Sequence, residues 1–172
     1  RHRIVTDAVH AAGGKICLQI LHTGRYAYHP LAVSASRLKS PISPFAPRAL
    51  TGWGVKKTIA DYARCARLAQ KAGYDGVEIM GSEGYLINQF LAPKTNHRSD
   101  EWGGSPENRR RFVLAVYAEI RHQVGPDFPV GIKLNSADFQ RGGFTEAESI
   151  ETIRALADAG IDLIEISGGT YE

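Results

Sequence analysis

Four short stretches of the chain are almost entirely apolar, and the longer stretches between them repeat apolar residues at helical spacing. The short stretches, which have the length of buried parallel strands, cover residues 15–21, 77–79, 128–134 and 161–166. The helical stretches cover residues 1–12, 58–72, 107–124 and 146–159. Strands that alternate with helices in this way predict a parallel α/β fold.

Capping residues mark several of the predicted helix ends. Glycine at position 73 ends the second helix. Ser105 followed by Pro106 fits the N-cap and first helical position of the third helix. Thr145 with Glu148 three residues later predicts a capping box at the start of the fourth. These boundaries separate each helix from a neighbouring strand.

A polar loop follows each predicted strand. Two of these loops, residues 31–55 and 91–106, are long and lack a helical period, which is typical of functional loops in a compact domain. No Gly-x-Gly-x-x-Gly sequence follows any strand, which disfavours a dinucleotide-binding doubly wound sheet. The pattern therefore favours a TIM (β/α)8 barrel, of which residues 1–172 are a partial domain with about half of the eight strands.

Composition and charge are ordinary for a globular protein. Hydrophobic residues make up 43% of the 172 residues, and the net charge of +3 does not suggest a nucleic acid or a membrane as partner. No apolar run is long enough to span a bilayer, and we expect no signal peptide. Cys17 and Cys65 have no metal-ligand spacing, so we expect buried thiols in a reducing, cytoplasmic compartment and no metal site. Because the chain opens with Arg1 and its only methionine is Met80, we expect a piece of a longer protein or a processed product.

The stretch 73–91 carries the most informative chemistry. It begins as a strand and continues into a turn that holds Glu83 and Tyr85, an acid and a phenol, at the strand's carboxyl end. In β/α proteins this end of the strand is where catalytic groups are normally placed. The alternative is an ordinary polar loop in which Ser82 starts a helix.

Two polar side chains interrupt otherwise apolar strands. Gln19 needs a hydrogen-bond partner, which the edge of a cofactor or neighbouring backbone would provide. Lys133 is costly to bury unless it is paired, so it faces a bound anion or an electron-rich ring, or else extends to the strand end. His22 and Arg25 follow the first strand, where they could bind an anion or position a ring; His22 could equally be an ordinary hydrogen-bonded histidine.

Several motifs, in the same order along nearly the whole chain, resemble the Old Yellow Enzyme family of FMN-dependent ene-reductases and NADH:flavin oxidoreductases. The motifs are Gln19-Ile20-Leu21-His22-Thr23-Gly24-Arg25, Gly73-Tyr74-Asp75-Gly76-Val77-Glu78-Ile79, Gly84-Tyr85-Leu86, Gln89-Phe90-Leu91, Asn96, Arg98, Gly103-Gly104-Ser105, Glu107-Asn108-Arg109 and Arg111-Phe112. The Glu83-Gly84-Tyr85 turn is similar to the 2,4-dienoyl-CoA reductase branch in particular.

The resemblance implies an enzyme that takes hydride from NADH or NADPH and reduces an activated C=C bond of an enoyl or dienoyl type. By the same resemblance, Gln19 binds the pyrimidine edge of FMN, and Lys133 takes the place of the family's arginine beside flavin N1 and O2. Tyr85 matches the proton-donor tyrosine, and Glu83 would tune either Tyr85 or a distant histidine. The expected substrate-binding residues are His22, Arg25, Tyr26, Asn96 and Arg98.

The chain departs from many relatives at the pair of residues that grips a substrate carbonyl. Met80 and Glu83 occupy these two positions, and a methionine cannot donate a hydrogen bond. Simple enones held by such a pair are therefore doubtful substrates.

Two other interpretations remain open. The residues could belong to a β/α fragment that binds no flavin, or Lys133 could be the Schiff-base amine of an aldolase-type barrel. For the 172 residues alone, open sheet edges predict a homo-oligomer. We also expect barrel-facing side chains to be partly uncovered, namely Val77, Ile79, Ile132 and Ile164.

Overall fold

The computed structural model describes all residues 1–172. Its elements, in chain order, are α1 (His2–Ala11), β1 (Cys17–Ile20), the 3₁₀ turn η1 (Gly24–Tyr26), β2 (Val33–Ser34), β3 (Arg48–Ala49), α2 (Gly52–Lys71), β4 (Gly76–Gly81), α3 (Leu86–Leu91), α4 (Pro106–Val124), β5 (Val130–Asn135), α5 (Glu146–Asp158) and β6 (Leu163–Ser167). The predicted alternation of strands and helices is therefore confirmed.

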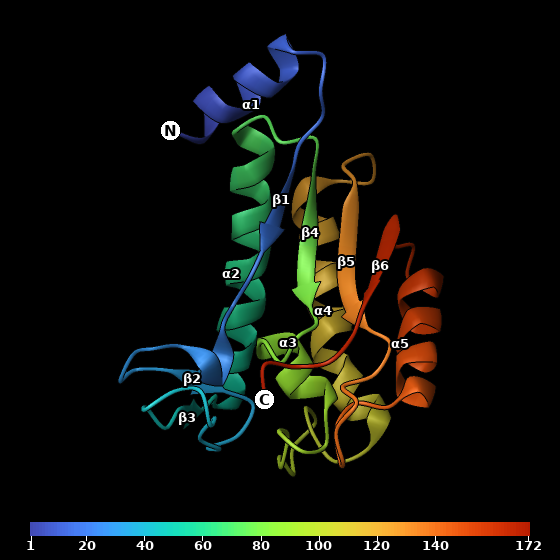
Figure 1. The fold of residues 1–172 in the computed structure, drawn as a ribbon. Coiled ribbons are helices and arrows are strands. Elements are labelled where there is room, and N and C mark those ends of the chain that lie inside the picture. Colours follow the sequence, from blue (N-terminus) through green and yellow to red (C-terminus); the bar gives the residue numbers. More distant parts are fainter.

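The four main strands form one parallel sheet in the order β1-β4-β5-β6. Helices α2, α4 and α5 cover one face of this sheet, and the other face carries no helix (Figure 1). Helix α1 lies beyond the amino ends of the strands, while β2, β3, α3 and the carboxyl terminus gather at the opposite end. The carboxyl ends of all four strands thus open into one region of loops.

The hydrophobic core lies between the sheet and the helices. Val77, Ile79 and Ile132 point into this core and are at most 2% exposed, because alternate strand residues face the helices. Phe90 of α3 stacks on Phe112 of α4 with ring centroids 4.1 Å apart, which packs these two helices together.

The expectation that Val77, Ile79 and Ile132 face the barrel interior is wrong. They pack under the helices, and only Ile164 of the four is partly exposed. The uncovered face instead carries polar side chains in two adjacent rows: Gln19 pairs with Glu78 in one row, and Lys133 pairs with Glu165 in the next. The face that a barrel would enclose is therefore polar in this chain.

Helix α2 begins six residues before its predicted start at Thr58. Thr51 caps it by accepting a hydrogen bond from the backbone N–H of Gly54 at 3.1 Å, and Val55 in the first turn is fully buried. The glycines at positions 52 and 54 concealed this turn in the sequence, because glycine is a poor helix former. The predicted caps Ser105 and Thr145 are confirmed, the second with both bonds of a capping box.

Both cysteines differ from the expected buried thiols. Cys17 is exposed because its side chain shares the uncovered sheet face with Gln19, and Cys65 is half-buried on α2. No helix in the structure is long and apolar enough to cross a bilayer.

Candidate active site

Three tyrosine rings meet where the loops that follow β1, β4 and β6 come together. The rings of Tyr26, Tyr85 and Tyr171 contact one another edge to face, with centroids 5.8–6.2 Å apart. They come from three separate loops, so only the folded sheet brings them together. We call these three residues the tyrosine cluster.

The carboxylate of Glu83 lies at the edge of the tyrosine cluster. It accepts hydrogen bonds from the Tyr171 hydroxyl at 3.1 Å and from the Ser167 hydroxyl at 3.3 Å. The neighbouring Tyr85 hydroxyl and the Glu83 carboxylate raise the pKa of Tyr171 to about 12. Tyr171 therefore stays protonated, and continues to donate to Glu83, across the physiological pH range.

The turn that carries Glu83 and Tyr85 has an unusual backbone. Glu83 has φ of 61° and Gly84 has φ of 82°, the left-handed region that favours glycine. A Cβ at position 84 would lie 2.1 Å from the Tyr26 hydroxyl, so only glycine allows Tyr26 to approach this closely. The backbone N–H of Glu83 donates to Asn135 Oδ1 at 3.2 Å, which ties the turn to β5.

Buried amides fix this turn from below. Asn88 accepts from the backbone N–H of Gly84 at 2.7 Å and donates to Asp138, which also accepts from Asn135. Gln89 donates to the backbone carbonyl of Gly84 at 2.6 Å and accepts from the backbone N–H of Arg25 at 3.0 Å. The strand-end loops are therefore held to one another as a rigid unit.

Arg25 contributes to this unit through a buried ion pair. Its guanidinium contacts the carboxylate of Glu172 and donates to the backbone carbonyl of Lys39, and Arg25 is 6% exposed. Burial and the Glu172 carboxylate both raise the pKa of the adjacent Tyr26. Because the Glu172 carboxylate neutralises its guanidinium, Arg25 is not available to bind an anion. It positions the neighbouring Tyr26 instead.

His22 lies apart from the tyrosine cluster. Its Nδ1 accepts a hydrogen bond from the backbone N–H of Gly24 at 3.0 Å, and burial lowers its pKa. The ring lines a cavity of about 200 Å³ between the end of β1 and helix α2, together with Thr58 and Tyr62. His22 is thus a neutral histidine bonded to local backbone, which is the alternative left open by the sequence.

Gln19 and Lys133 lie on the uncovered face of the sheet, in adjacent rows of side chains. The Gln19 amide donates to Glu78 Oε2 at 2.6 Å, and Lys133 Nζ lies 2.9 Å from Glu165 Oε1. The hydrogen bond to Glu165 raises the pKa of Lys133, and burial raises the pKa of Glu78. The face therefore offers a polarised amide and a permanent cation side by side.

This face suits the ring of a flavin. Its neutral amide can accept and donate along the pyrimidine edge, and its cation can balance negative charge on the ring. Gln19 is exposed and Lys133 partly exposed, so a ligand on the uncovered face can reach both side chains. No cluster of three or more histidine, cysteine or acidic side chains in the structure could hold a metal ion.

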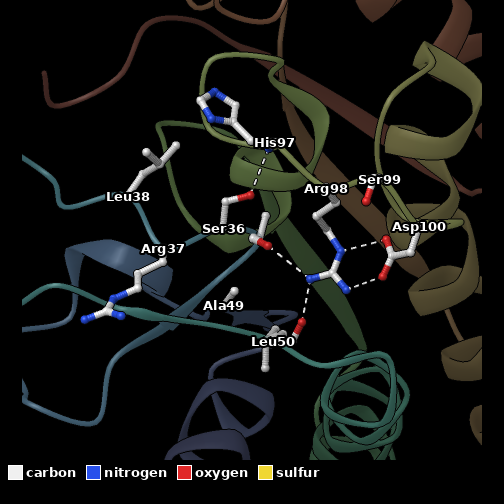
Figure 2. Close-up of a pocket in the computed structure, with 10 residues that line it drawn as sticks. Ser36, Arg37, Leu38, Ala49, Leu50, His97, Arg98, Ser99 and Asp100 are labelled. Carbon is white, nitrogen blue, oxygen red and sulfur yellow. Dashed lines mark hydrogen bonds and ion pairs between the residues drawn. The ribbon is translucent and has the colours of Figure 1, made fainter.

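Asn96 and Arg98 make contacts that stabilise the long loops. Asn96 is buried and donates to the backbone carbonyls of Phe90 and Trp102. Arg98 donates to the carbonyls of Ala35 and Leu50 and pairs with Asp100 (Figure 2). No contact joins either residue to the tyrosine cluster.

Sequence reasoning missed Tyr171, Asn135 and Glu172. Asn135 and Tyr171 lie in or just after loops recognised as strand ends, but the amino-acid pattern gives no sign that Tyr171 would reach Glu83 across three strands. The sequence contains one sign that Tyr171 could belong to the site, which is its position four residues after the last strand. A rule that gathers every polar residue after a strand end would have included it.

The family model of the NADH:flavin oxidoreductase / NADH oxidase family matches residues 1–171. The NADH-dependent flavin oxidoreductase nadA of Aspergillus parasiticus is 41% identical over 173 residues, which cover 96% of this chain and 39% of that protein. The match extends across the whole sheet and all the loops described above.

Solved structures agree with these relatives. A complex of 2-naphthoyl-CoA reductase with 2-naphthoyl-CoA superimposes with a TM-score of 0.93 at 35% identity, covering 99% of this chain and 28% of that one. An Old Yellow Enzyme homologue from Zymomonas mobilis gives 0.89 at 30% identity, covering 99% and 52%. The chain spans from about a quarter to about half of the proteins it matches, and its four parallel strands are part of a (β/α)8 barrel. The chain therefore belongs to the NADH:flavin oxidoreductase / NADH oxidase family, the FMN-dependent family of Old Yellow Enzyme.

Proposed function

We propose that these residues form the catalytic part of an FMN-dependent oxidoreductase that takes hydride from NADH or NADPH and reduces an activated C=C bond. One observation carries this proposal. The phenol of Tyr85, supported by Glu83 and Tyr171, lies at the carboxyl end of the same strands whose uncovered face bears Gln19 and Lys133. A proton donor and a flavin-binding face are the two parts that such a reduction requires.

FMN, when bound, supplies the hydride for the β-carbon of the alkene. Gln19 would hold the pyrimidine edge of the ring, and Lys133 would place a cation beside the region where negative charge develops. Lysine is a point charge and lacks the planar fork of arginine. It therefore supplies the positive charge but fixes the orientation of the ring less strictly.

Tyr85 would give its phenolic proton to the carbon next to the one that receives hydride. Tyr171, fixed by its bond to Glu83, packs against the Tyr85 ring and limits its rotation. Tyr26 packs on the third side of the cluster. Tyr85 and Glu83 are the proposed catalytic pair, and Tyr171 is a positioning residue.

The substrate class follows from what the site lacks as well as from what it holds. Met80 is buried and has no donor for a substrate carbonyl, so a simple enone would be weakly polarised. The resemblance of the Glu83-Gly84-Tyr85 turn to the 2,4-dienoyl-CoA reductase branch favours an enoyl or dienoyl thioester instead. We place this activity in the cytoplasm, with small molecules as the only proposed partners apart from further copies of the chain.

The geometry disfavours a Schiff-base aldolase. A lysine nucleophile must be neutral, yet the ion pair with Glu165 raises the pKa of Lys133. Treatment with borohydride and a carbonyl substrate should leave Lys133 unmodified.

An absorbance spectrum of the protein, followed by anaerobic addition of NADH or NADPH, tests the proposed function. We expect an oxidised flavin band that bleaches on reduction and returns when an activated alkene is added. A folded protein that stays colourless after incubation with FMN would contradict the proposal and would favour a β/α fragment without flavin.

A further inference from the structure

A cavity between the two long loops shares no residue with the tyrosine cluster and has no role in the proposed chemistry. It measures about 480 Å³, within the range of small-molecule sites. Its walls are residues 35–38 and 49–50 on one side and residues 97–100 on the other (Figure 2). The two walls belong to the two long loops that follow β1 and α3.

The cavity is preformed. Arg98 donates to the backbone carbonyl of Ala35 at 3.0 Å and to that of Leu50 at 2.5 Å, which joins the two walls across its floor. The backbone N–H of His97 donates to the Ser36 hydroxyl at 2.8 Å and makes a second link. A ligand therefore meets walls that are already held in place.

The charge of the cavity is positive. Its one acid, Asp100, is matched by two hydrogen bonds from Arg98, whereas the guanidinium of Arg37 and the ring of His97 have no partner. The wider segment has the same sign, because residues 8–60 contain seven Lys or Arg and no Asp or Glu. Two unpaired basic side chains thus flank a floor formed by Ala35, Ala49 and Leu50.

A hydrogen bond links one wall of the cavity to the loop that carries Tyr26. Leu38 lines the cavity, and the carbonyl of the next residue, Lys39, accepts a hydrogen bond from Arg25. Arg25 precedes Tyr26 of the tyrosine cluster. One wall of the cavity is thus joined to the loop that carries Tyr26 by a single hydrogen bond.

We propose that this cavity binds the phosphate-bearing adenosine end of a nucleotide ligand, with Arg37 and His97 contacting phosphate and the apolar floor contacting the base. This inference rests on the proposed function, because two of its ligands carry such an end: the nicotinamide dinucleotide that donates hydride, and a coenzyme A thioester that accepts it. Arginine pairs with phosphate through two parallel hydrogen bonds, which suits an unpaired guanidinium at the rim of a pocket.

Calorimetric titration of the purified protein with three probes tests the proposal and separates the two sources. The probes are ADP, adenosine 2′,5′-bisphosphate and adenosine 3′,5′-bisphosphate, which represent the adenosine ends of NADH, NADPH and coenzyme A. We expect at least one to bind, with an affinity that falls as salt rises. Preference for the 3′,5′ probe assigns the cavity to the thioester, and preference for either of the others assigns it to the hydride donor.

Matched variants connect the binding to the cavity. Arg37→Ser should weaken the preferred probe by about tenfold or more, the scale of one charge-assisted hydrogen bond. Ser99→Asp, which adds a negative charge to an exposed position of the wall, should weaken it as well. Arg64→Ser removes an exposed, unpaired arginine of α2 that does not line the cavity, and should leave the affinity unchanged.

Failure of all three probes to bind at millimolar concentration would overturn the proposal, as would equal losses in Arg37→Ser and Arg64→Ser. The flavin spectrum is read separately on the same samples. A yellow protein that NAD(P)H reduces but that binds no probe would contradict the cavity assignment alone, whereas probe binding by a protein that takes up no FMN would contradict the proposed function.

Discussion

At the scale of single residues, Glu83 has a backbone conformation that a carboxylate seldom adopts. A non-glycine residue in the left-handed region costs on the order of 1–3 kcal/mol and persists only where its surroundings hold it. Here a bond to Asn135, a backbone bridge to Thr170 and the hydroxyls of Ser167 and Tyr171 all fix Glu83. Local strain is thus retained where the candidate chemistry lies.

Within the tyrosine cluster, we expect Tyr85→Phe and Tyr171→Phe to slow alkene reduction by different amounts. Tyr85→Phe removes the proposed proton donor and should slow alkene reduction about a hundredfold, the scale of a positioned general acid. Tyr171→Phe removes the hydroxyl that donates to Glu83 and neighbours the Tyr85 hydroxyl, and should slow alkene reduction about tenfold. In both variants the reduction of flavin by NAD(P)H should be unchanged, which stopped-flow absorbance measures separately for each half-reaction.

Tyr28→Phe is the control, because Tyr28 is 78% exposed and packs on Phe45 outside the cluster. Equal losses in both half-reactions of Tyr85→Phe would show that Tyr85 is structural. A Tyr171→Phe variant as slow as Tyr85→Phe would make Tyr171 the donor instead.

Lys133 predicts a redox effect. Lys133→Met keeps an unbranched side chain, one atom shorter, but removes its charge, so negative charge on the reduced flavin would lose its nearby cation. The midpoint potential should fall, by tens of millivolts if the cation contributes about 1–2 kcal/mol. Spectroelectrochemistry measures this potential, with Lys57→Met on the exposed side of α2 as control; an unchanged potential would remove Lys133 from the flavin site.

At the scale of elements, the turn between α2 and β4 is joined to the turn between α1 and β1 through Asp75. Its carboxylate accepts hydrogen bonds from His10 Nε2 and from the backbone N–H of Ile16, both at 2.8 Å, and lies 3.2 Å from Lys15 Nζ. The hydrogen bond from His10, with that from Ile16, lowers the pKa of Asp75 well below its usual range. This carboxylate therefore fixes the start of β1 beside β4.

Asp75→Asn should lower the free energy of unfolding at neutral pH, and the difference from the unchanged protein should depend on pH. A carboxyl whose pKa is lowered by folding stabilises the protein above its unfolded value of about 3.9, and this contribution is lost as pH falls toward the folded value. Urea unfolding at pH 7 and near pH 2.5 should therefore give a smaller difference at the acidic pH. A difference that does not change with pH would mean that Asp75 acts through shape alone.

At the scale of the whole molecule, the sheet has two open edges. Strand β1 pairs only with β4, and β6 pairs only with β5. Exposed apolar side chains lie at both edges, Leu21 at 42% and Ile166 at 55%. Because unpaired edges and apolar side chains favour association, both edges invite contact with further polypeptide.

The 172 residues as a separate polypeptide should therefore form a homodimer or a larger assembly. Light scattering at several concentrations measures the mass, and Ile166→Lys should shift it toward the monomer by adding a charge to one edge. A monodisperse species of 18.8 kDa in the unchanged polypeptide would contradict this prediction.

The sequence by itself determined the elements, because the signals for them are local. The apolar runs of β4 and β5, the caps at Ser105 and Thr145 and the stop at Gly73 depend on neighbouring residues only, so these predictions are confirmed. The family motifs add the class of chemistry, since residue types at fixed spacing are also local. Helix α2 was predicted too short, because its buried first turn depends on contacts with the rest of the core.

Only the tertiary structure decided which side chains meet. The strand pattern has a period of two but does not say which face is covered, so Val77 and Ile79 were placed on the wrong side. The contact of Tyr171 with Glu83 spans 88 residues, and the ion pair of Arg25 with Glu172 spans 147. The order of strands in the sheet sets both contacts, and no local pattern contains that order.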